Sequence, residues 1–254
     1  MQIITSKDNE IVKSIRKLKE KKYRDLNSQY IVEGTKIVKE AIEENTKIQT
    51  IVICEECIEE GAIEQKLLYD IAKFNCIYVN KKIFLTLTEV QNPQGVLAVI
   101  AKEKEKNEID YSDDLLLVLD DIQDPGNMGT ILRTADSVGL KQIIISKGNV
   151  DVYSPKVIRS TMGAIFRINI VESDNLKETI KEIKKNKFEV LATSLQNSES
   201  IYSVKYRKKA IVIGNEANGV SKEVLELCDK KIKIPMLREN RKLKCCSSNK
   251  CNSI

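Results

Sequence analysis

Leu115 to Leu140, LLLVLDDIQDPGNMGTILRTADSVGL, combines an apolar run, a polar loop and a helical pattern. The apolar residues of 115–119 do not alternate with polar ones, which is typical of a parallel strand covered on both faces. Acidic residues, a Pro and a Gly over 120–128 predict a turn. Apolar residues at helical spacing then predict a helix over 128–138. In open α/β sheets ligands bind at the loop after a strand's carboxyl end, so this loop is a candidate ligand site.

The same strand–helix alternation continues toward the C-terminus. Strands are predicted at 115–119, 142–146, 167–171, 188–193, 210–214 and 231–235, and helices at about 128–138, 155–162, 174–185 and 220–228. Strands that alternate with helices predict a mostly parallel sheet with helices on both faces. The fold class is therefore α/β.

The N-terminal half has a smaller α/β pattern of its own. A basic helical lead-in is predicted over 1–28, helices near 36–44 and 63–74, and strands at 48–54, 77–79 and 96–101. The segment 102–114, KEKEKNEIDYSDD, is highly charged and predicts a linker. We therefore expect one domain over 1–101 and a second that begins at residue 115.

Composition describes an ordinary globular protein, with 254 residues, 42% hydrophobic and 31% charged. No run approaches the roughly 18 apolar residues of a membrane span, and no secretory signal is apparent, so we expect a cytoplasmic protein without a membrane partner. The net charge is +5, and basic residues gather at 13–24 and 205–209. Such runs suit a polyanion such as RNA, although each could equally be a solvated helix face.

The absence of His restricts the possible chemistry. Cys/His zinc sites are excluded, and Cys54 with Cys57 is only half of a zinc site, so no metal is expected. His is also the commonest general base. Any proton transfer must therefore use another side chain or the substrate.

A second strand-to-loop site lies in Ile211 to Ser221, IVIGNEANGVS. Gly214 and Gly219 flank Glu216, and glycines let backbone approach a ligand closely, although most strand–Gly–helix turns are structural. A third apolar strand ends at Ile234–Met236. Three neighbouring strand ends are expected to face one crevice.

Together these stretches resemble the SpoU (TrmH-like) family of RNA ribose 2′-O-methyltransferases. The three motifs are Asn127-x-Gly129-x-x-x-Arg133, Gly214-Asn215-Glu216-x-x-Gly219 and Ile234-Pro235-Met236. Tyr30–Gly34 and Pro93–Gly95 look like the L30e-like substrate-binding domain that many members carry. The resemblance covers 1–237, and it implies an RNA-binding domain over 1–101 and an α/β-knot methyltransferase domain over 115–237. The trefoil knot of this family is an exception to the usual unknotted topology.

The resemblance also implies ligands and site residues. The cofactor would be S-adenosylmethionine, the partner rRNA or tRNA rather than DNA, and the assembly a homodimer. Catalysis is assigned to Arg133, Asn127 and Glu216, and the cofactor pocket to Thr193, Ser194, Ile213, Gly214, Gly219, Ile234 and Met236. The expected RNA contacts are Lys13, Arg16, Lys17, Arg24, Arg159 and Ser160. Alternatives stay open, because Asn127 and Glu216 could simply brace loops, Arg133 could bind phosphate only, and Arg159 and Ser160 could be structural.

The chain departs from the family after Leu237, where RENRKLKCCSSNKCNSI has no apolar helical stripe. The family continues with a Gly, then Ser-Leu-Asn and an apolar helix. One back-translation of Arg238–Ile254, with its first base removed, encodes Gly-Lys-Thr-Glu-Ser-Leu-Asn-Val-Ala-Val-Ala-Ile-Ser-Val-Ile-Leu. We therefore expect that 238–254 is an aberrant, frameshifted tail, that the knot is incomplete and that activity is impaired.

Two other functions stay under consideration. A catalytically inactive RNA-binding protein is the main alternative, because the lead-in and residues up to 101 do not depend on the tail. A Rossmann oxidoreductase is disfavoured, since no G-x-G-x-x-G follows a predicted strand.

Overall fold

The computed structural model describes residues 3–102 and 108–235, and these form two compact units. The first unit contains the described residues up to Lys102 together with Asp151–Arg167. The second contains the described residues of 108–150 and 168–235. Within the described residues, no helix has the length and apolarity needed to cross a membrane.

The first unit is built on a five-stranded sheet in the order β1-β4-β3-β5-β2. Its strands are β1 (Ile3–Ile4), β2 (Gln29–Glu33), β3 (Ile48–Cys54), β4 (Cys76–Val79) and β5 (Val96–Ala101). β1, β4 and β3 run parallel, whereas β5 is antiparallel to β3 and β2. Both neighbours of β5 pair with it, and its first five residues are buried, as expected for a central strand.

Helices surround this sheet. They are α1 (Glu10–Lys17), α2 (Lys21–Asn27), α3 (Thr35–Glu43), α4 (Glu55–Glu59), α5 (Gln65–Ile71), α6 (Lys81–Leu87) and α8 (Pro155–Thr161), with a 3-10 turn η1 (Ala164–Phe166). Asn9 caps α1, because its Oδ1 accepts hydrogen bonds from the amides of Ile11 (2.9 Å) and Val12 (3.4 Å). The lead-in is thus two short helices and a strand rather than one helix, and the sequence did not predict α4 or α6.

The segment Asp151–Arg167 packs within the first unit, although β7 and β8 of the second unit flank it in the chain. The ring of Tyr153 lies 4.8 Å from that of Tyr30, centroid to centroid. Arg167 forms ion pairs with Glu40 (2.6 Å) and Glu44 (3.0 Å) on or next to α3. The sequence did not predict this grouping, since all of these partners are distant in the chain.

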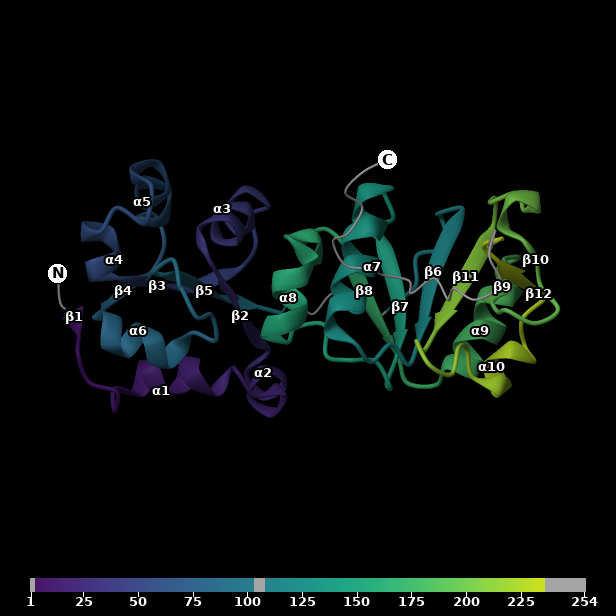
Figure 1. Cartoon of the computed structure of the whole chain (residues 1–254), viewed down its shortest axis with the longest axis horizontal. Helices are drawn as coiled ribbons and strands as arrows, with labels where there is room; N and C mark the ends of the chain where they lie inside the picture. The colour runs from purple at the N-terminus through teal and green to yellow at the C-terminus, as the bar shows by residue number, and fades with distance from the viewer. Residues whose placement is uncertain (1–2, 103–107, 236–254) are drawn as a thin grey trace. The chain divides into compact units, whose positions relative to one another are not determined.

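The second unit contains a seven-stranded, all-parallel sheet in the order β10-β12-β9-β11-β6-β7-β8. Its strands are β6 (Leu115–Asp120), β7 (Gln142–Ser146), β8 (Asn169–Ser173), β9 (Glu189–Thr193), β10 (Glu199–Ser200), β11 (Lys209–Gly214) and β12 (Lys230–Lys233). The predicted α/β class with a mostly parallel sheet is confirmed (Figure 1). The expected knot depends on residues after Pro235, which lie outside the described residues, as does the tail 238–254.

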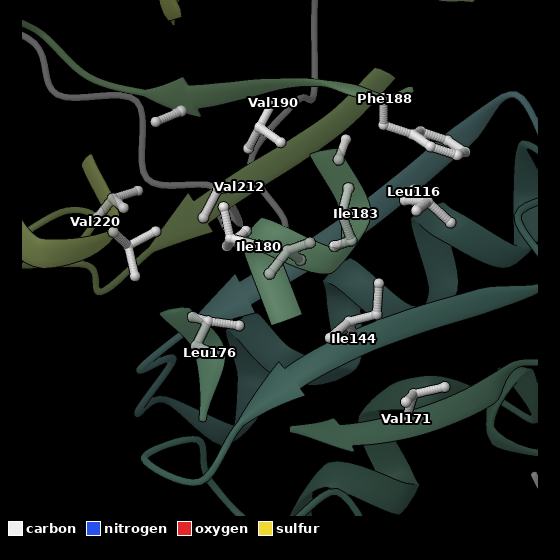
Figure 2. Packing of buried hydrophobic residues seen from close by; sticks show 14 residues of the cluster. Leu116, Ile144, Val171, Leu176, Ile180, Ile183, Phe188, Val190, Val212 and Val220 are labelled. Carbon is white, nitrogen blue, oxygen red and sulfur yellow. The ribbon is translucent and has the colours of Figure 1, made fainter. Parts of the chain in front are cut away.

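Helices α9 (Leu176–Lys185) and α10 (Lys222–Leu225) supply apolar side chains to the core of this unit, and α7 (Pro125–Ser137) follows β6. Figure 2 shows Ile180 and Ile183 of α9 pointing toward side chains of the sheet, among them Val212. Ile109 and Tyr111 pack against the same core. The described end of the expected linker, 108–114, is therefore attached to the second unit.

Several predicted element boundaries were shifted by two or three residues, among them those of β8, α10 and α7. β8 begins at Asn169 rather than 167, because the η1 turn and the Arg167 ion pairs precede it. α10 is limited to Lys222–Leu225, shorter than the predicted 220–228. α7 starts three residues earlier than predicted, because Asp124 caps it and Pro125 is its first residue.

Candidate functional site

The loop after β6 is fixed by the start of α7. Asp124 caps this helix, and its Oδ1 accepts a hydrogen bond from the amide of Asn127 at 2.8 Å. Pro125 follows at the first helical position, where its missing N–H costs nothing. The polar loop that the sequence predicted therefore ends at Asp124, and Asn127 lies in the first turn of the helix.

Asn127 contacts the loop after β11. Its Nδ2 donates to Oε1 of Glu216 at 2.8 Å, across 89 positions in the sequence. The second oxygen of Glu216 accepts a longer bond, 3.4 Å, from the amide of Gln123. Asn127 is buried, whereas Glu216 is exposed. The two motif residues are thus together, and the carboxylate of Glu216 joins both loops; their catalytic role stays a prediction.

The loop after β11 is closely packed around its glycines. A Cβ on Gly214 would lie 2.1 Å from the amide nitrogen of Val220, so only glycine fits there. Gly219 has φ +74°, a conformation that glycine adopts without strain. Asn215 Nδ2 donates to the carbonyl of Asp121 at 2.9 Å, while its Oδ1 accepts from the amide of Ala217, also at 2.9 Å.

Asn149, in the loop after β7, was not predicted from the sequence. Its Nδ2 donates to the carbonyls of Leu119 (3.0 Å) and Ser146 (2.8 Å), and its Oδ1 accepts from the amide of Ile122 at 2.8 Å. Gln123 contributes from the other side, with Nε2 donating to the carbonyl of Gly148 at 2.5 Å. The loops after β6, β7 and β11 are therefore braced together by Asn and Gln side chains. The only sequence signal was an Asn shortly after a strand end.

Arg133 lies exposed on α7, six positions after Asn127. A guanidinium can bind a phosphate or stabilise a developing negative charge. Its assignment to catalysis remains a prediction.

The expected cofactor residues lie at the carboxyl ends of β9, β11 and β12, which are neighbours in the sheet. Thr193 Oγ1 donates to the carbonyl of Val212 at 3.1 Å, and the amide of Ser194 donates to the carbonyl of Ile232 at 3.0 Å. Ile213 is half-buried and Ile234 is 49% exposed. Accessible apolar side chains beside strand-end backbone suit the adenosyl part of S-adenosylmethionine. Met236 lies outside the described residues.

One expected RNA contact is wrong. Arg24 is only 3% exposed, and its guanidinium donates to Asp151 and to the carbonyls of Leu18 and Lys19. A cation that is buried and fully engaged cannot bind RNA phosphate from the surface. The basic run of the lead-in therefore contains a structural residue, which periodicity alone did not separate from its exposed neighbours.

The other expected RNA contacts are at least partly accessible. Lys17 is exposed, with its ammonium 5.3 Å from the ring centroid of Tyr23, and Arg16 is half-buried. Lys13 pairs with Glu10 at 3.3 Å. Ser160 Oγ donates to the carbonyl of Lys156 at 2.9 Å, which is a local helix bond.

Arg159 lines a small pocket of the first unit with an empty volume of about 310 Å³, counting its open mouth. The pocket is lined by Lys19, Ile31, Glu33, Leu87, Glu89, Pro155, Ile158 and Arg159. Burial raises the pKa of the Glu33 carboxyl, although a hydrogen bond from Thr88 opposes that shift. Charged groups around an apolar floor suit a polar ligand, but Glu33 already accepts a bond from Thr88, so a purely structural role accounts for it as well.

The described residues contain no group of three or more Cys, Asp or Glu side chains arranged to hold a metal ion.

Comparison with known proteins agrees with this geometry. Residues 114–243 match the model of the SpoU rRNA Methylase family, and residues 9–98 match the MRM3-like substrate binding domain. The chain is 30% identical over 237 residues to the 23S rRNA (guanosine(2553)-2′-O)-methyltransferase RlmP of Bacillus subtilis, which covers 93% of this chain and 91% of that protein.

Solved structures give the same result. An AdoMet-bound rRNA methyltransferase from Sinorhizobium meliloti is 30% identical with a TM-score of 0.82, covering 95% of this chain and 92% of that one. An RNA 2′-O ribose methyltransferase is 26% identical with a TM-score of 0.79, covering 96% and 93%.

Proposed function

Since this chain belongs to the SpoU rRNA methylase family, we propose that it transfers a methyl group from S-adenosylmethionine to a ribose 2′-hydroxyl of rRNA. The observation that carries the proposal is the Asn127–Glu216 hydrogen bond of 2.8 Å. It joins the loops of two motifs that are 89 residues apart, at the edge of a parallel sheet where ligands bind.

The first unit supports RNA as the substrate. It matches a substrate-binding domain and exposes basic side chains, among them Lys17 on α1. The relative from B. subtilis acts on a guanosine ribose of 23S rRNA, which makes rRNA the first substrate to test. We also propose a homodimer, which light scattering of the purified chain would detect.

The chain's own residues have four tasks in this reaction. Ile213 and Ile234 would hold the cofactor by apolar contact, and the Gly214 turn keeps side chains away from the strand end. Bound S-adenosylmethionine supplies an electrophilic methyl group on its sulfonium sulfur. Glu216 and Asn127 hold the two loops in register, and pre-organised geometry of this kind accelerates a displacement. Arg133 would bind phosphate and stabilise the negative charge that develops on the 2′-oxygen.

The residues after Leu237 bear on how well this site works. We propose that turnover is impaired, because 238–254 lacks the Ser-Leu-Asn of the third motif and the apolar helix that follows it in the family. On β11, Ala210 and Val212 are buried while Ile211 and Ile213 are only half-buried. An apolar helix encoded by the shifted frame would have apolar side chains of this kind to cover.

The experiment compares two proteins, the chain as it stands and a frame-restored form with one base deleted after the Leu237 codon. Transfer of labelled methyl to rRNA, with the products digested to nucleosides, reports both rate and position. We expect 2′-O-methylated nucleosides from the restored protein, little from the present chain, and loss of at least about a hundredfold with Arg133→Ala.

Each alternative has its own outcome. RNA binding by both proteins without methyl transfer by either would support the inactive RNA-binding protein instead. Methylation of a base rather than a ribose would contradict the proposed chemistry. Equal S-adenosylmethionine affinity in the two proteins, measured by calorimetric titration, would contradict the impairment.

A further inference from the structure

The segment between β9 and β11 exposes aromatic and apolar side chains to solvent. Tyr202 is 79% exposed, Leu195 70% and Tyr206 41%. A solvent-exposed tyrosine ring forgoes the burial that normally stabilises it, so exposed rings in one short segment make that segment a candidate contact surface.

The topology places Tyr202 at the functional edge of the second sheet. It lies in the 3-10 turn η2 (Ile201–Ser203), which directly follows β10. Because β10 runs parallel to β12, and every other pairing in this sheet is also parallel, η2 lies at the same edge as the loops that carry Asn127 and Glu216. Four strand spacings separate β10 from β6, which amounts to about 19 Å. Tyr202 is thus on the same edge of the sheet as the motif loops, but at a distance from them.

The turn that carries the ring is held in one conformation by its own hydrogen bonds. Ser200 Oγ accepts from the amide of Tyr202 at 3.2 Å, and Ser203 Oγ donates to the carbonyl of Ser200 at 2.7 Å. Tyr206 donates its hydroxyl hydrogen to the carbonyl of Ile201 at 2.9 Å, which closes the turn. A ring presented on a braced turn loses little conformational freedom when a partner binds.

The basic run 205–209 that follows this turn contains both engaged and accessible cations. Lys208 donates to the carbonyl of Tyr111 at 2.6 Å, and Lys209 pairs with Glu189. Lys205 and Arg207 are exposed, and neither forms an ion pair with another residue of the described part of the chain. The positive charge at this surface is therefore available to an anionic partner.

We propose that Tyr202 stacks on an unpaired base of the RNA substrate and that Lys205 and Arg207 bind the adjoining phosphates. The inference rests on the proposed function, and it assigns a contact surface for single-stranded RNA to the methyltransferase unit itself. Aromatic rings beside a cationic track are the chemistry that single strands use, because every base has a face to stack. Paired bases of a duplex do not offer that face.

The chain contains no tryptophan, so Tyr202→Trp creates a single fluorescent reporter at this position. Tyr69→Trp is the matched control, because Tyr69 is also highly exposed (72%) and lies under a lysine, Lys73, but on α5 of the first unit. The full-length variants are titrated with a labelled single-stranded RNA of ~12 nucleotides, a length typical of such sites, while polarisation of the label reports binding independently. We expect quenching of the indole fluorescence in Tyr202→Trp that follows the polarisation curve, and none in the control.

Substitutions measure how much each side chain contributes to the affinity for RNA. Tyr202→Ala should weaken RNA binding about 5- to 150-fold, while Tyr202→Phe should stay within a few-fold because the ring remains. Replacing Lys205 and Arg207 by Ala should lower the slope of log affinity against log salt by about 1.4. The duplex form of the same RNA should leave the indole fluorescence of Tyr202→Trp unchanged.

Several results would overturn the inference. If polarisation shows saturation while the indole of Tyr202→Trp is silent, the RNA contact is elsewhere and the proposed function still stands. An indole signal with S-adenosylmethionine alone would assign the ring to the cofactor, and one that depends on protein concentration alone would assign it to a second copy of the chain. Absence of any RNA binding would defeat both this inference and the proposed function.

Discussion

Replacing Arg24 by Met should destabilise the first unit more than any change of an exposed cation in the same basic run. The side chains of Arg24 and Asp151 are only 4% and 12% exposed, and Nη2 and Nε of Arg24 donate to the same carboxylate oxygen at 2.5 and 3.1 Å. Nη1 donates to the carbonyls of Leu18 at 2.7 Å and Lys19 at 2.6 Å. The substitution leaves an almost buried carboxylate without its cationic partner, while the hydrogen bond from the amide of Tyr153 at 2.9 Å remains.

Breaking a buried ion pair by removing one partner costs about 3–5 kcal/mol. Hydrogen exchange measures the loss of stability amide by amide, which avoids the assumption that a two-unit protein unfolds in one step. A loss of 1.36 kcal/mol corresponds to a tenfold faster exchange, so amides of α2 and of 151–161 should exchange about 150- to 5,000-fold faster in Arg24→Met than in the wild type. Lys17→Met should change exchange by less than about threefold, since exposed substitutions stay within about 0.5 kcal/mol.

A double variant separates the two contributions. Arg24→Met with Asp151→Asn should be more stable than the sum of the single changes predicts, by about 1–3 kcal/mol, because the unpaired charge has been removed. It should not recover fully, since the carbonyls of Leu18 and Lys19 still lack their donor. Additive effects, or a single-variant cost below about 1 kcal/mol, would refute the structural role of Arg24.

Three further outcomes follow from the structure. Gly214→Ala should lower the free energy of unfolding, measured by chemical denaturation, by about 3 kcal/mol or more, because its Cβ would lie 2.1 Å from a backbone nitrogen. Gly139 has φ +79° but open space around it, so Gly139→Ala should lower the free energy of unfolding by only about 1 kcal/mol. Equal losses in the two variants would contradict the packing argument. Burial raises the pKa of Glu33, so the folded state holds the proton of this carboxyl more tightly than the unfolded state does. As the pH rises from the ordinary pKa of 4.5 through the raised pKa, the wild type should lose stability relative to Glu33→Gln. Parallel curves of stability against pH for the two proteins would refute this. Burial beside Cys57 raises the pKa of Cys54 to about 12, so peptide mapping should find Cys54 unalkylated in the native protein at about pH 8 and alkylated in denaturant, and rapid native labelling would contradict it.

The sequence predicted those parts of the fold that depend on local pattern. Strand β3 was predicted over 48–54 as observed, because seven residues rich in β-branched side chains lie between polar segments. The carboxyl-edge position of the Asn127 and Glu216 loops followed from strand–helix alternation and the family resemblance. Helix α6 was missed, since its signal was an Asn80 cap on a short apolar run that fits a strand equally well.

Properties that depend on distant partners could not be predicted. The basic run suggested RNA contact for Arg24, and only the position of Asp151, 127 residues later, shows that this guanidinium is buried. The braces from Asn149 and Gln123 are likewise invisible in the sequence, because an amide after a strand end has many possible partners. The charge and the hydrophobic periodicity of a segment indicate which residues share a helix face, but they do not specify which distant residues pack against that face.

The membership of Asp151–Arg167 in the first unit has a consequence during synthesis. Arg24 leaves the ribosome 127 residues before Asp151, which at 5–20 residues per second is an interval of about 6–25 s. Throughout that interval the guanidinium lacks its carboxylate, and Tyr30 lacks the ring of Tyr153. Strands β6 and β7 of the second unit are translated within the same interval. The first unit therefore cannot be completed until β6 and β7 have also been translated, and during that interval a nascent-chain chaperone would encounter both units unfinished.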